Sequence, residues 1–401
     1  MKVKVLLYLL LSMGLVITGC KAPMKKVAKP AYDTPIPPGQ YALRKIINPS
    51  QVPDFTLACF DLEGVKPAVE RSLNYLSKPS SKRFFPVSGI DHQMAVVSLK
   101  EFSALLDSGL TGASLNAAIM DRFDVYMSVG CDNKGTVLFT GYFTPILEGS
   151  LGPSERFKYP LYKQPDNLVK GPNGEILGRR MSDGSTIAYP SRAVIEDAMM
   201  LRGKELVWLS DPFEAYIAHI QGSAKIKLPD GRLITAGYAA HNGYEYRSIS
   251  QALVSDGRIP GSQLSLAAII EYFKKFPDQV SYYTRLNPRY IFFSRQEGEP
   301  RGSLNEPVTP MRTIATDKSI FPRGCLAFIS TTLPKDIAGN AILQPYSGFA
   351  LDQDTGGAIR APGRCDVYMG QGDTAGKLAG QTYQEGKLYY LFLKQSASYS
   401  E

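Results

Sequence analysis

The residues best placed for chemistry lie in segment 350–357, which reads ALDQDTGG. A short apolar stretch leads into two aspartates, Asp352 and Asp354, and then into Thr-Gly-Gly. A carboxylate at the end of a strand can act as a general acid or base, and glycines beside it let a polymer approach the backbone closely. Gly-rich turns also follow many strands without doing chemistry, so a structural turn is the alternative for this segment by itself.

Other common catalytic signatures do not occur in the sequence, which has no G-x-S-x-G, no Walker motif and no H-E-x-x-H. The three histidines, His92, His219 and His241, are widely separated, which argues against a Ser-His-Asp hydrolase. No C-x-x-C pair or histidine cluster indicates a metal site. We therefore expect no metal and no other cofactor, and we expect carboxylates to carry the chemistry.

Two more aspartates stand in patterned segments on either side. Asp317 lies in 315–325 (ATDKSIFPRGC), and Asp366 lies in 365–370 (CDVYMG). With 350–357, these segments resemble the three-aspartate domain of the lytic transglycosylase A family, a double-psi β-barrel related to the barrels of expansins and barwin. Further matches follow the family's order along the chain: 139–145 (FTGYFTP), 159–162 (YPLY), 189–193 (YPSRA), 221–223 (QGS) and 242–249 (NGYEYRSI).

The resemblance implies an α+β fold, mainly β, in which a double-psi β-barrel with N-terminal helices faces a second, inserted β-rich domain across a groove. Composition marks off the same insertion, because turns rich in Gly and Pro separate short strands from about residue 146 to 242. We expect the barrel domain with its helices to comprise 54–145 and 243–401, and the insert to comprise 146–242.

Local patterns predict the elements that position these segments. Apolar spacing and strand composition predict helices and then a strand in the first part of the body: 64–76, 99–106 and 115–127, then 136–143. In the insert, Ser191 and Asp211-Pro212 are typical helix starts, and 229–231 (PDG) predicts a hairpin turn. Beyond it we expect helices at 249–254 and 264–276, and strands at 290–293, 325–330, 349–351, 364–368 and 388–393.

The resemblance also implies a lytic transglycosylase that cleaves the β-1,4 bond between N-acetylmuramic acid and N-acetylglucosamine in peptidoglycan, forming 1,6-anhydromuramic acid ends. One carboxyl group protonates the departing oxygen and then accepts the C6 hydroxyl proton. Asp354, directly before Thr-Gly-Gly, holds the family's catalytic position. Because that group must be protonated at rest, burial or neighbouring carboxylates should raise its pKa, and Asp317, Asp352 and Asp366 are the candidate neighbours.

Each supporting aspartate has a structural alternative. Asp317 could cap a turn with Ser319, Asp366 could brace the barrel, and Asp352, with the same strand parity as Asp354, could line the groove or be solvated. Further residues are implied to bind sugars, although they could instead fill the seam between the domains: Thr140, Gly141, Tyr142, Gln221, Gly222, Ser223, Asn242, Arg247, Gly356 and Gly357.

Two other functions remain compatible with these residues. One is a hydrolytic glycosidase that uses Asp354 with Asp317 or Asp352 as a true pair, and the other is a glycan-binding lipoprotein that does not cut. The net charge of +8 suits an acidic polymer such as peptidoglycan, and no dense Lys/Arg run indicates nucleic acid. Other cell-wall enzymes are further candidate partners.

The N-terminus predicts export and lipidation. Lys2 and Lys4 precede an apolar run that is too short to span a bilayer, and 17–20 (ITGC) resembles the bacterial lipobox. We expect a signal peptide at 1–19, a lipid on Cys20 and a Pro- and Lys-rich tether over 20–53. Because Lys and not Asp follows Cys20, lipoprotein sorting in Gram-negative envelopes implies the outer membrane, with the catalytic body facing the periplasm.

Four cysteines remain once Cys20 is lipidated, and an even number suggests disulfides in an oxidising compartment. We expect Cys325, which stands where the family usually has Thr, to pair with Cys365. Cys59 would then pair with Cys131 across the N-terminal part. Four free, buried thiols are the alternative.

Overall fold

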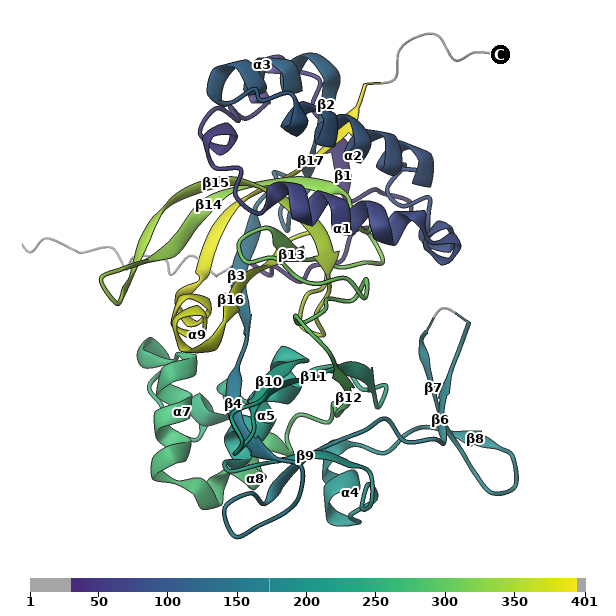
Figure 1. Ribbon diagram of the computed structural model, residues 1–401, viewed down its shortest axis with the longest axis vertical. Coiled ribbons are helices and arrows are strands. Elements are labelled where there is room, and N and C mark those ends of the chain that lie inside the picture. Colours follow the sequence, from purple (N-terminus) through teal and green to yellow (C-terminus); the bar gives the residue numbers. More distant parts are fainter. Residues whose placement is uncertain (1–29, 173, 395–401) are drawn as a thin grey trace, which may run out of the picture. The chain divides into compact units, whose positions relative to one another are not determined.

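The computed structural model describes residues 30–172 and 174–394 (Figure 1). The expected signal peptide and the lipidated Cys20 lie outside the described residues. Contacts group Ala31–Glu401 into one unit, to which the following description refers. In the part of the chain that the structure describes, no helix is long and apolar enough to cross a membrane.

The first part of this unit is helical, as the apolar spacing predicts. α1 (Val65–Ser77), α2 (His92–Asp107) and α3 (Gly112–Arg122) each bury residues three or four positions apart, so one face packs on the core. Asp91 begins α2, because its side chain accepts a hydrogen bond from the Met94 amide. The expected helix at 115–127 is too long, since 123–128 form a strand with buried Phe123 and Val125.

A closed β-barrel dominates the larger of the sheets. The strand order is β1-β2-β17-β14-β15-β13-β16-β3, and β17 also pairs with β3, which closes a ring of six strands. β17 reaches both neighbours because it is long: Tyr383–Gly386 pair with β3, and Lys387–Tyr390 pair with β14. The strands are β1 (Leu43–Lys45), β2 (Phe123–Ser128), β3 (Val137–Thr144), β13 (Thr313–Ala315), β14 (Leu326–Ile337), β15 (Asn340–Asp354), β16 (Arg364–Gln371) and β17 (Tyr383–Leu393).

The barrel therefore combines segments from far apart in the sequence. β3 lies beside β16 in parallel, and their different colours in Figure 1 show this distance along the chain. The helices share the barrel's core: the Phe102 ring of α2 lies 5.1 Å from that of Phe349, which pairs across the sheet with Phe328. The expected α+β fold, mainly β and built around a barrel, is confirmed.

A second sheet of six strands has the order β12-β11-β10-β4-β9-β5 and buries its own apolar cluster. The predicted hairpin joins β10 to β11, with Gly231 in the left-handed region at φ 85°. The sheet also takes in β12, so it extends past the boundary expected at residue 242. Its strands are β4 (Ile146–Ser150), β5 (Tyr159–Tyr162), β9 (Glu205–Leu209), β10 (Ala224–Lys227), β11 (Leu233–His241) and β12 (Ile291–Gln296).

Helix α5 (Pro212–Gln221) links this sheet to the barrel strand β3. Asp211 caps α5 as predicted, by accepting the amides of Phe213 and Glu214. At the other end of α5, the Gln221 side chain accepts a hydrogen bond from the Phe143 amide of β3 (3.1 Å).

The other helices that the structure describes are α4 (Arg192–Asp197), α6 (Ser250–Ser255), α7 (Leu266–Lys275), α8 (Val280–Thr284) and α9 (Gly372–Gln381). A small third sheet consists of β6 (Leu168–Lys170), β7 (Ile176–Arg180) and β8 (Thr186–Ile187). Short 3-10 turns lie at Pro49–Gln51, Ala58–Phe60, Pro79–Phe84, Gly261–Gln263 and Pro277–Gln279.

Candidate active site

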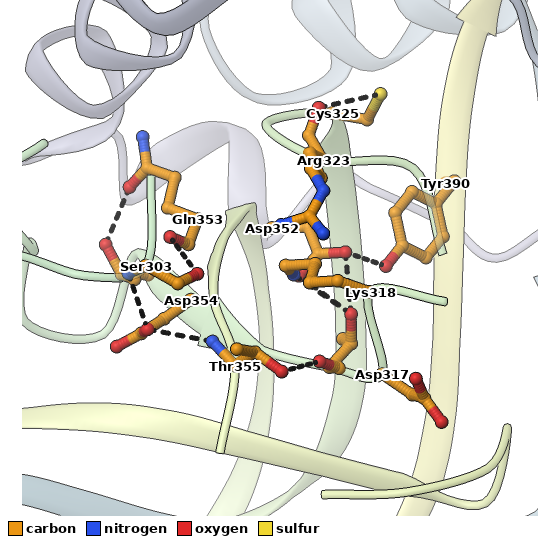
Figure 2. Close-up of polar contacts among 12 residues, drawn as sticks. Ser303, Asp317, Lys318, Arg323, Cys325, Asp352, Gln353, Asp354, Thr355 and Tyr390 are labelled. Carbon is orange, nitrogen blue, oxygen red and sulfur yellow. Dashed lines mark hydrogen bonds and ion pairs between the residues drawn. The ribbon is translucent and has the colours of Figure 1, made fainter. Parts of the chain in front are cut away.

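Asp354 is the last residue of β15, and groups from three segments hold its carboxylate. Oδ1 accepts hydrogen bonds from the backbone N–H of Ser303 and of Thr355, each at 2.8 Å (Figure 2). Oδ2 accepts a hydrogen bond from the Tyr142 hydroxyl of β3 at 2.9 Å. The backbone is fixed as well, because the Thr316 amide donates to the Asp354 carbonyl. The direction of the carboxylate is therefore set before any substrate binds.

The surroundings of Asp354 favour its protonated form. Burial raises the pKa of this carboxyl above its usual range. The hydrogen bonds from Thr355, Ser303 and Tyr142 and the charge of Lys318 lower the pKa, but burial outweighs them. The expected rise is therefore present, and burial, not a neighbouring carboxylate, is its main cause.

Asp366 of β16 is a second carboxyl group beside Asp354. Burial raises its pKa to about 6, with Arg364 opposing the rise and the charge of Asp354 adding to it. In the part of the chain that the structure describes, its Oδ1 has no hydrogen-bond partner and lies 4.0 Å from an Arg364 nitrogen. Asp366 can therefore hold a proton near pH 6 without being fixed in one orientation.

Asp317 adopts the structural alternative. Its Oδ1 accepts hydrogen bonds from the amide (3.0 Å) and hydroxyl (2.6 Å) of Ser319, and its Oδ2 accepts one from the Ala361 amide (2.9 Å). The side chain thus caps one turn and ties it to the loop that follows Thr-Gly-Gly. Asp317 is not among the residues that line the cavities around Asp354.

Asp352 neither lines the groove nor is solvated, so both expectations for it were wrong. The reason is a β-bulge at Gln353: opposite β13, Asp352 pairs with Ile314 and Asp354 pairs with Ala315, the very next residue. The extra residue turns the two carboxylates away from each other (Figure 2). Equal strand parity therefore does not place them on one face.

The Asp352 side chain is fully buried within a polar cluster inside the barrel. Its carboxylate forms an ion pair with Lys318, which is itself only 4% exposed. It also accepts hydrogen bonds from the hydroxyls of Thr316 (2.8 and 3.0 Å) and Tyr390 (2.8 Å). Thr316 links this cluster to the site, because its carbonyl accepts the Thr355 hydroxyl.

Asp354 lies where two adjoining cavities meet, of about 250 Å³ and about 480 Å³. We call them together the cleft, and we name the smaller cavity the Asp366 side and the larger one the Arg301 side. Residues of the barrel and of the six-stranded sheet line both. The residues common to the two cavities are Tyr142, Gln221, Gly222, Tyr238, Arg289, Asp354, Thr355, Gly356 and Gly357.

Most of the residues expected to bind sugars lie in this cleft, and three do not. Gly141 lines the Asp366 side and Ser223 the Arg301 side, in addition to the common residues. Asn242 is buried and braces the backbone, donating to the carbonyls of Pro190 and Pro288. The Thr140 hydroxyl accepts a hydrogen bond from Arg364, and neither Thr140 nor Arg247 lines either cavity.

Several lining residues were not predicted from the sequence. Tyr238 comes from the irregular part of β11, Arg289 precedes β12, and Arg301 and Ser303 belong to a loop after β12. The loop lies directly against Asp354, since a Cβ on Gly302 would lie 3.1 Å from the Asp354 carboxyl carbon. The only sequence signal for this loop is an RGS tripeptide, which is too common to single out.

The expected disulfides are wrong, because Cys59, Cys131, Cys325 and Cys365 are all free thiols in the structure. Cys325 precedes β14 and Cys365 lies in β16, and β15 and β13 separate those strands in the sheet. The Cys325 thiol instead contacts the Arg323 carbonyl (Figure 2). Cys59 lies in a 3-10 turn beneath α3, whereas Cys131 lies in the turn after β2.

Family models match both parts of the chain that build the cleft. The model described as "MltA specific insert domain" matches residues 138–294, and the model described as "3D domain" matches residues 312–392. The first range ends close to the end of β12, in agreement with the extent of the six-stranded sheet. The second range covers the barrel strands that carry Asp354 and Asp366.

Similar proteins cover most of the chain. Membrane-bound lytic murein transglycosylase A of Vibrio cholerae is 30% identical over 270 residues, which are 67% of this chain and 68% of that protein. A membrane-bound lytic murein transglycosylase from Agrobacterium tumefaciens matches in structure with a TM-score of 0.74 and 25% identity, covering 88% of this chain and 98% of that one. E. coli MltA with bound chitohexaose shares the fold, with a TM-score of 0.67 and 23% identity, covering 92% and 97%.

Proposed function

The chain belongs to the membrane-bound lytic murein transglycosylase A family and is a peptidoglycan lytic transglycosylase, and we propose that it cleaves the β-1,4 bond between N-acetylmuramic acid and N-acetylglucosamine with Asp354 as its one catalytic acid and base. The observation that carries this proposal is the single fixed carboxyl group at the centre of the cleft. Burial raises its pKa, and Tyr142, Ser303 and Thr355 hold its orientation. The products are strands that end in 1,6-anhydromuramic acid, as expected for cell-wall turnover.

The proton transfers follow from this geometry. Protonated Asp354 donates its proton to the oxygen that leaves with N-acetylglucosamine as the bond to C1 of muramic acid breaks. The C6 hydroxyl of the same muramic acid then bonds to C1 and gives its proton to the Asp354 carboxylate. No water is consumed, and the intramolecular attack gains effective molarity. The Tyr142 hydroxyl and two backbone amides stabilise the carboxylate between the two steps.

The cleft supports the binding of a glycan strand across Asp354. Tyr142 and Tyr238 offer aromatic faces and hydroxyls, and Gly356 and Gly357 leave room for a sugar ring close to the backbone. The chitohexaose bound to E. coli MltA is a glycan chain, which supports the same class of ligand here. Thr140 and Asn242 then act through the framework and not by contact with sugar, and Arg247 lines neither side of the cleft.

We extend the proposal to location. Relatives are named membrane-bound, and the ITGC segment supports a lipid on Cys20, an outer-membrane anchor and a body facing the periplasm. A Cys20→Ser variant should be released in soluble form or remain unprocessed. Other cell-wall enzymes are candidate partners at this location.

Asp366 makes a hydrolytic mechanism the second candidate. A pKa of about 6 allows it to act as a base for water above that pH. The pairs expected for a hydrolase from the sequence, Asp354 with Asp317 or Asp352, lack support because neither Asp317 nor Asp352 lines the cleft.

Mass spectrometry of the muropeptides released from purified sacculi separates the two mechanisms. Anhydro-muropeptides as the initial products support Asp354 acting alone. Reducing muramic acid ends, with one atom of ¹⁸O taken up from labelled water, would reject the proposal in favour of the pair with Asp366.

A further inference from the structure

The two sides of the cleft differ in charge. The Asp366 side contains the carboxyl groups of both Asp354 and Asp366. Of the residues that line the Arg301 side, Asp354 carries the only carboxyl group, whereas Arg289, Arg301 and Arg360 carry guanidinium groups. A glycan strand that crosses Asp354 therefore meets an excess of guanidinium groups on the Arg301 side, whereas on the Asp366 side Arg192 and Arg289 match the two carboxyl groups in number.

Two of these arginines lack a carboxylate partner. Arg289 Nη1 donates to the Tyr244 carbonyl (2.8 Å), and Arg301 Nη1 donates to the Asn305 carbonyl (2.7 Å). Within residues 30–172 and 174–394, no carboxylate oxygen lies within 4.0 Å of either guanidinium, whereas Arg360 lies 3.5 Å from one of Glu245. Since a guanidinium has five N–H donors, each retains donors for a ligand.

Both arginines lie close to Asp354 and the glycines that follow it. A Cβ on Gly357 would lie 3.2 Å from Arg289 Nε, so the guanidinium rests directly on that glycine. Arg301 is two residues before Ser303, whose amide holds the Asp354 carboxylate. The positive charges also affect a neighbouring residue. Burial lowers the pKa of His241 to about 4, and the charges of Arg289, Arg360 and Lys170 contribute to this lowering.

We propose that Arg289 and Arg301 form a subsite for a carboxylate carried by the muramic acid residues of the strand. The inference rests on the proposed function. In such a strand only alternate sugars bear a lactyl ether, which ends in a carboxylate or in a peptide that carries carboxylates. A guanidinium fork suits either group. Engaging it on one side of Asp354 sets the register, so that a muramic acid C1, and not that of N-acetylglucosamine, lies at the catalytic carboxyl.

Binding to the full chain with Asp354→Asn, which prevents cleavage, tests the subsite. Three probes of similar length are compared: neutral chitohexaose, peptide-free strands with free lactyl carboxylates, and peptide-bearing strands. Arg289→Gln and Arg301→Gln should each weaken binding of the acidic strands roughly tenfold and change chitohexaose binding less than about twofold. Loss on peptide-free strands identifies the lactyl carboxylate, and loss only on peptide-bearing strands identifies the peptide.

Arg295→Gln is the matched control, because Arg295 is a half-exposed residue of β12 that lines neither side of the cleft. Retained chitohexaose affinity shows that each variant is folded. Salt provides a test without substitution of either arginine: affinity for acidic strands should fall with added NaCl while that for chitohexaose does not. Equal loss on all three probes, or equal salt dependence, would overturn the subsite. Failure to form anhydro ends would instead overturn the proposed function and leave this binding test intact.

Discussion

Asp354 and Asp352 lie two residues apart in one strand, yet they occupy opposite kinds of environment. Asp352 is sealed inside the barrel, where Lys318, Thr316 and Tyr390 provide a cation and two hydroxyl donors. Asp354 faces the cleft, where it receives hydrogen bonds, and the structure describes no cation within 4.0 Å of it. The surroundings of Asp352 form an ion pair with it, and the surroundings of Asp354 raise the pKa of its carboxyl group.

The difference shows that burial alone does not decide what a carboxyl group does. A buried carboxyl with an adjacent cation belongs to the framework, because the pair must be kept together to offset its desolvation. A buried carboxyl without an adjacent cation holds its proton more tightly and becomes available as an acid. The bulge at Gln353 places an ion-paired carboxylate and a carboxyl group with a raised pKa two residues apart in one strand.

The largest effect should come from Asp354→Asn. Asparagine keeps the shape and can still hydrogen-bond to Tyr142, but it cannot donate a proton to the leaving oxygen. Activity on sacculi should fall by about 10²–10⁴-fold or more, because in the proposed mechanism the same group acts in both steps. Thermal unfolding and chitohexaose binding should stay close to those of the parent protein. Asp278→Asn, at an exposed position, is the control, and an active Asp354 variant would move the chemistry elsewhere.

Sequence reasoning singled out Asp354 because segments 315–325, 350–357 and 365–370 together resemble the family's three-aspartate domain, whereas the secondary-structure predictions depend on local information. The β3 strand and the hairpin at Gly231 are each specified by neighbouring residues, and both are confirmed in the structure. The role of Asp354 stays a prediction. The predicted cap at Asp211 depends in the same way on a few adjacent residues.

The environment of Asp352 was not predictable in this way. Its partners Lys318 and Tyr390 come from other segments, and the bulge that separates it from Asp354 depends on the register with β13. Arg289 and Arg301 were missed for the same reason, since only the fold brings them beside Gly357 and Asp354. The cysteine pairs failed because an even count carries no information about distance.

Lys318→Met should cause the largest loss of stability. It leaves the Asp352 carboxylate buried without its cation, which costs about 3–5 kcal/mol in comparable pairs. The double variant with Asp352→Asn removes both charges and should recover a large part of that loss. Equilibrium denaturation of the two single variants and the double variant measures the coupling. Strictly additive losses would show that the pair does not act as a unit.

Asp366 tests the intermediate case of a half-buried carboxyl with a distant cation. Its raised pKa means that the protonated form stabilises the fold: this contribution is fully present below about pH 4 and is lost as the pH rises through about 6. Asp366→Asn should therefore be more stable than the parent protein above pH 6, by roughly 2 kcal/mol, and equally stable near pH 4. Thermal unfolding across this range, with Asp336→Asn as an exposed control, checks the sign. A difference that does not depend on pH would contradict it.

Asp352→Asn should have the smallest of these effects on activity, and its effect should appear as a shift in the pH dependence of kcat/KM. Burial lowers the pKa of Lys318 and Asp352 raises it, so Asp352→Asn lowers the pKa of Lys318 further. While Lys318 is protonated, its unpaired charge lowers the pKa of Asp354. Because the proposed mechanism requires protonated Asp354, the alkaline limb of kcat/KM should move to lower pH. Activity at neutral pH should fall about tenfold, equivalent to about 1.4 kcal/mol. Lys318→Met should move the same limb to higher pH, because it removes the charge. If the alkaline limb of kcat/KM moves in the same direction in both variants, or does not move in either, the buried pair of Asp352 and Lys318 does not affect the pKa of Asp354.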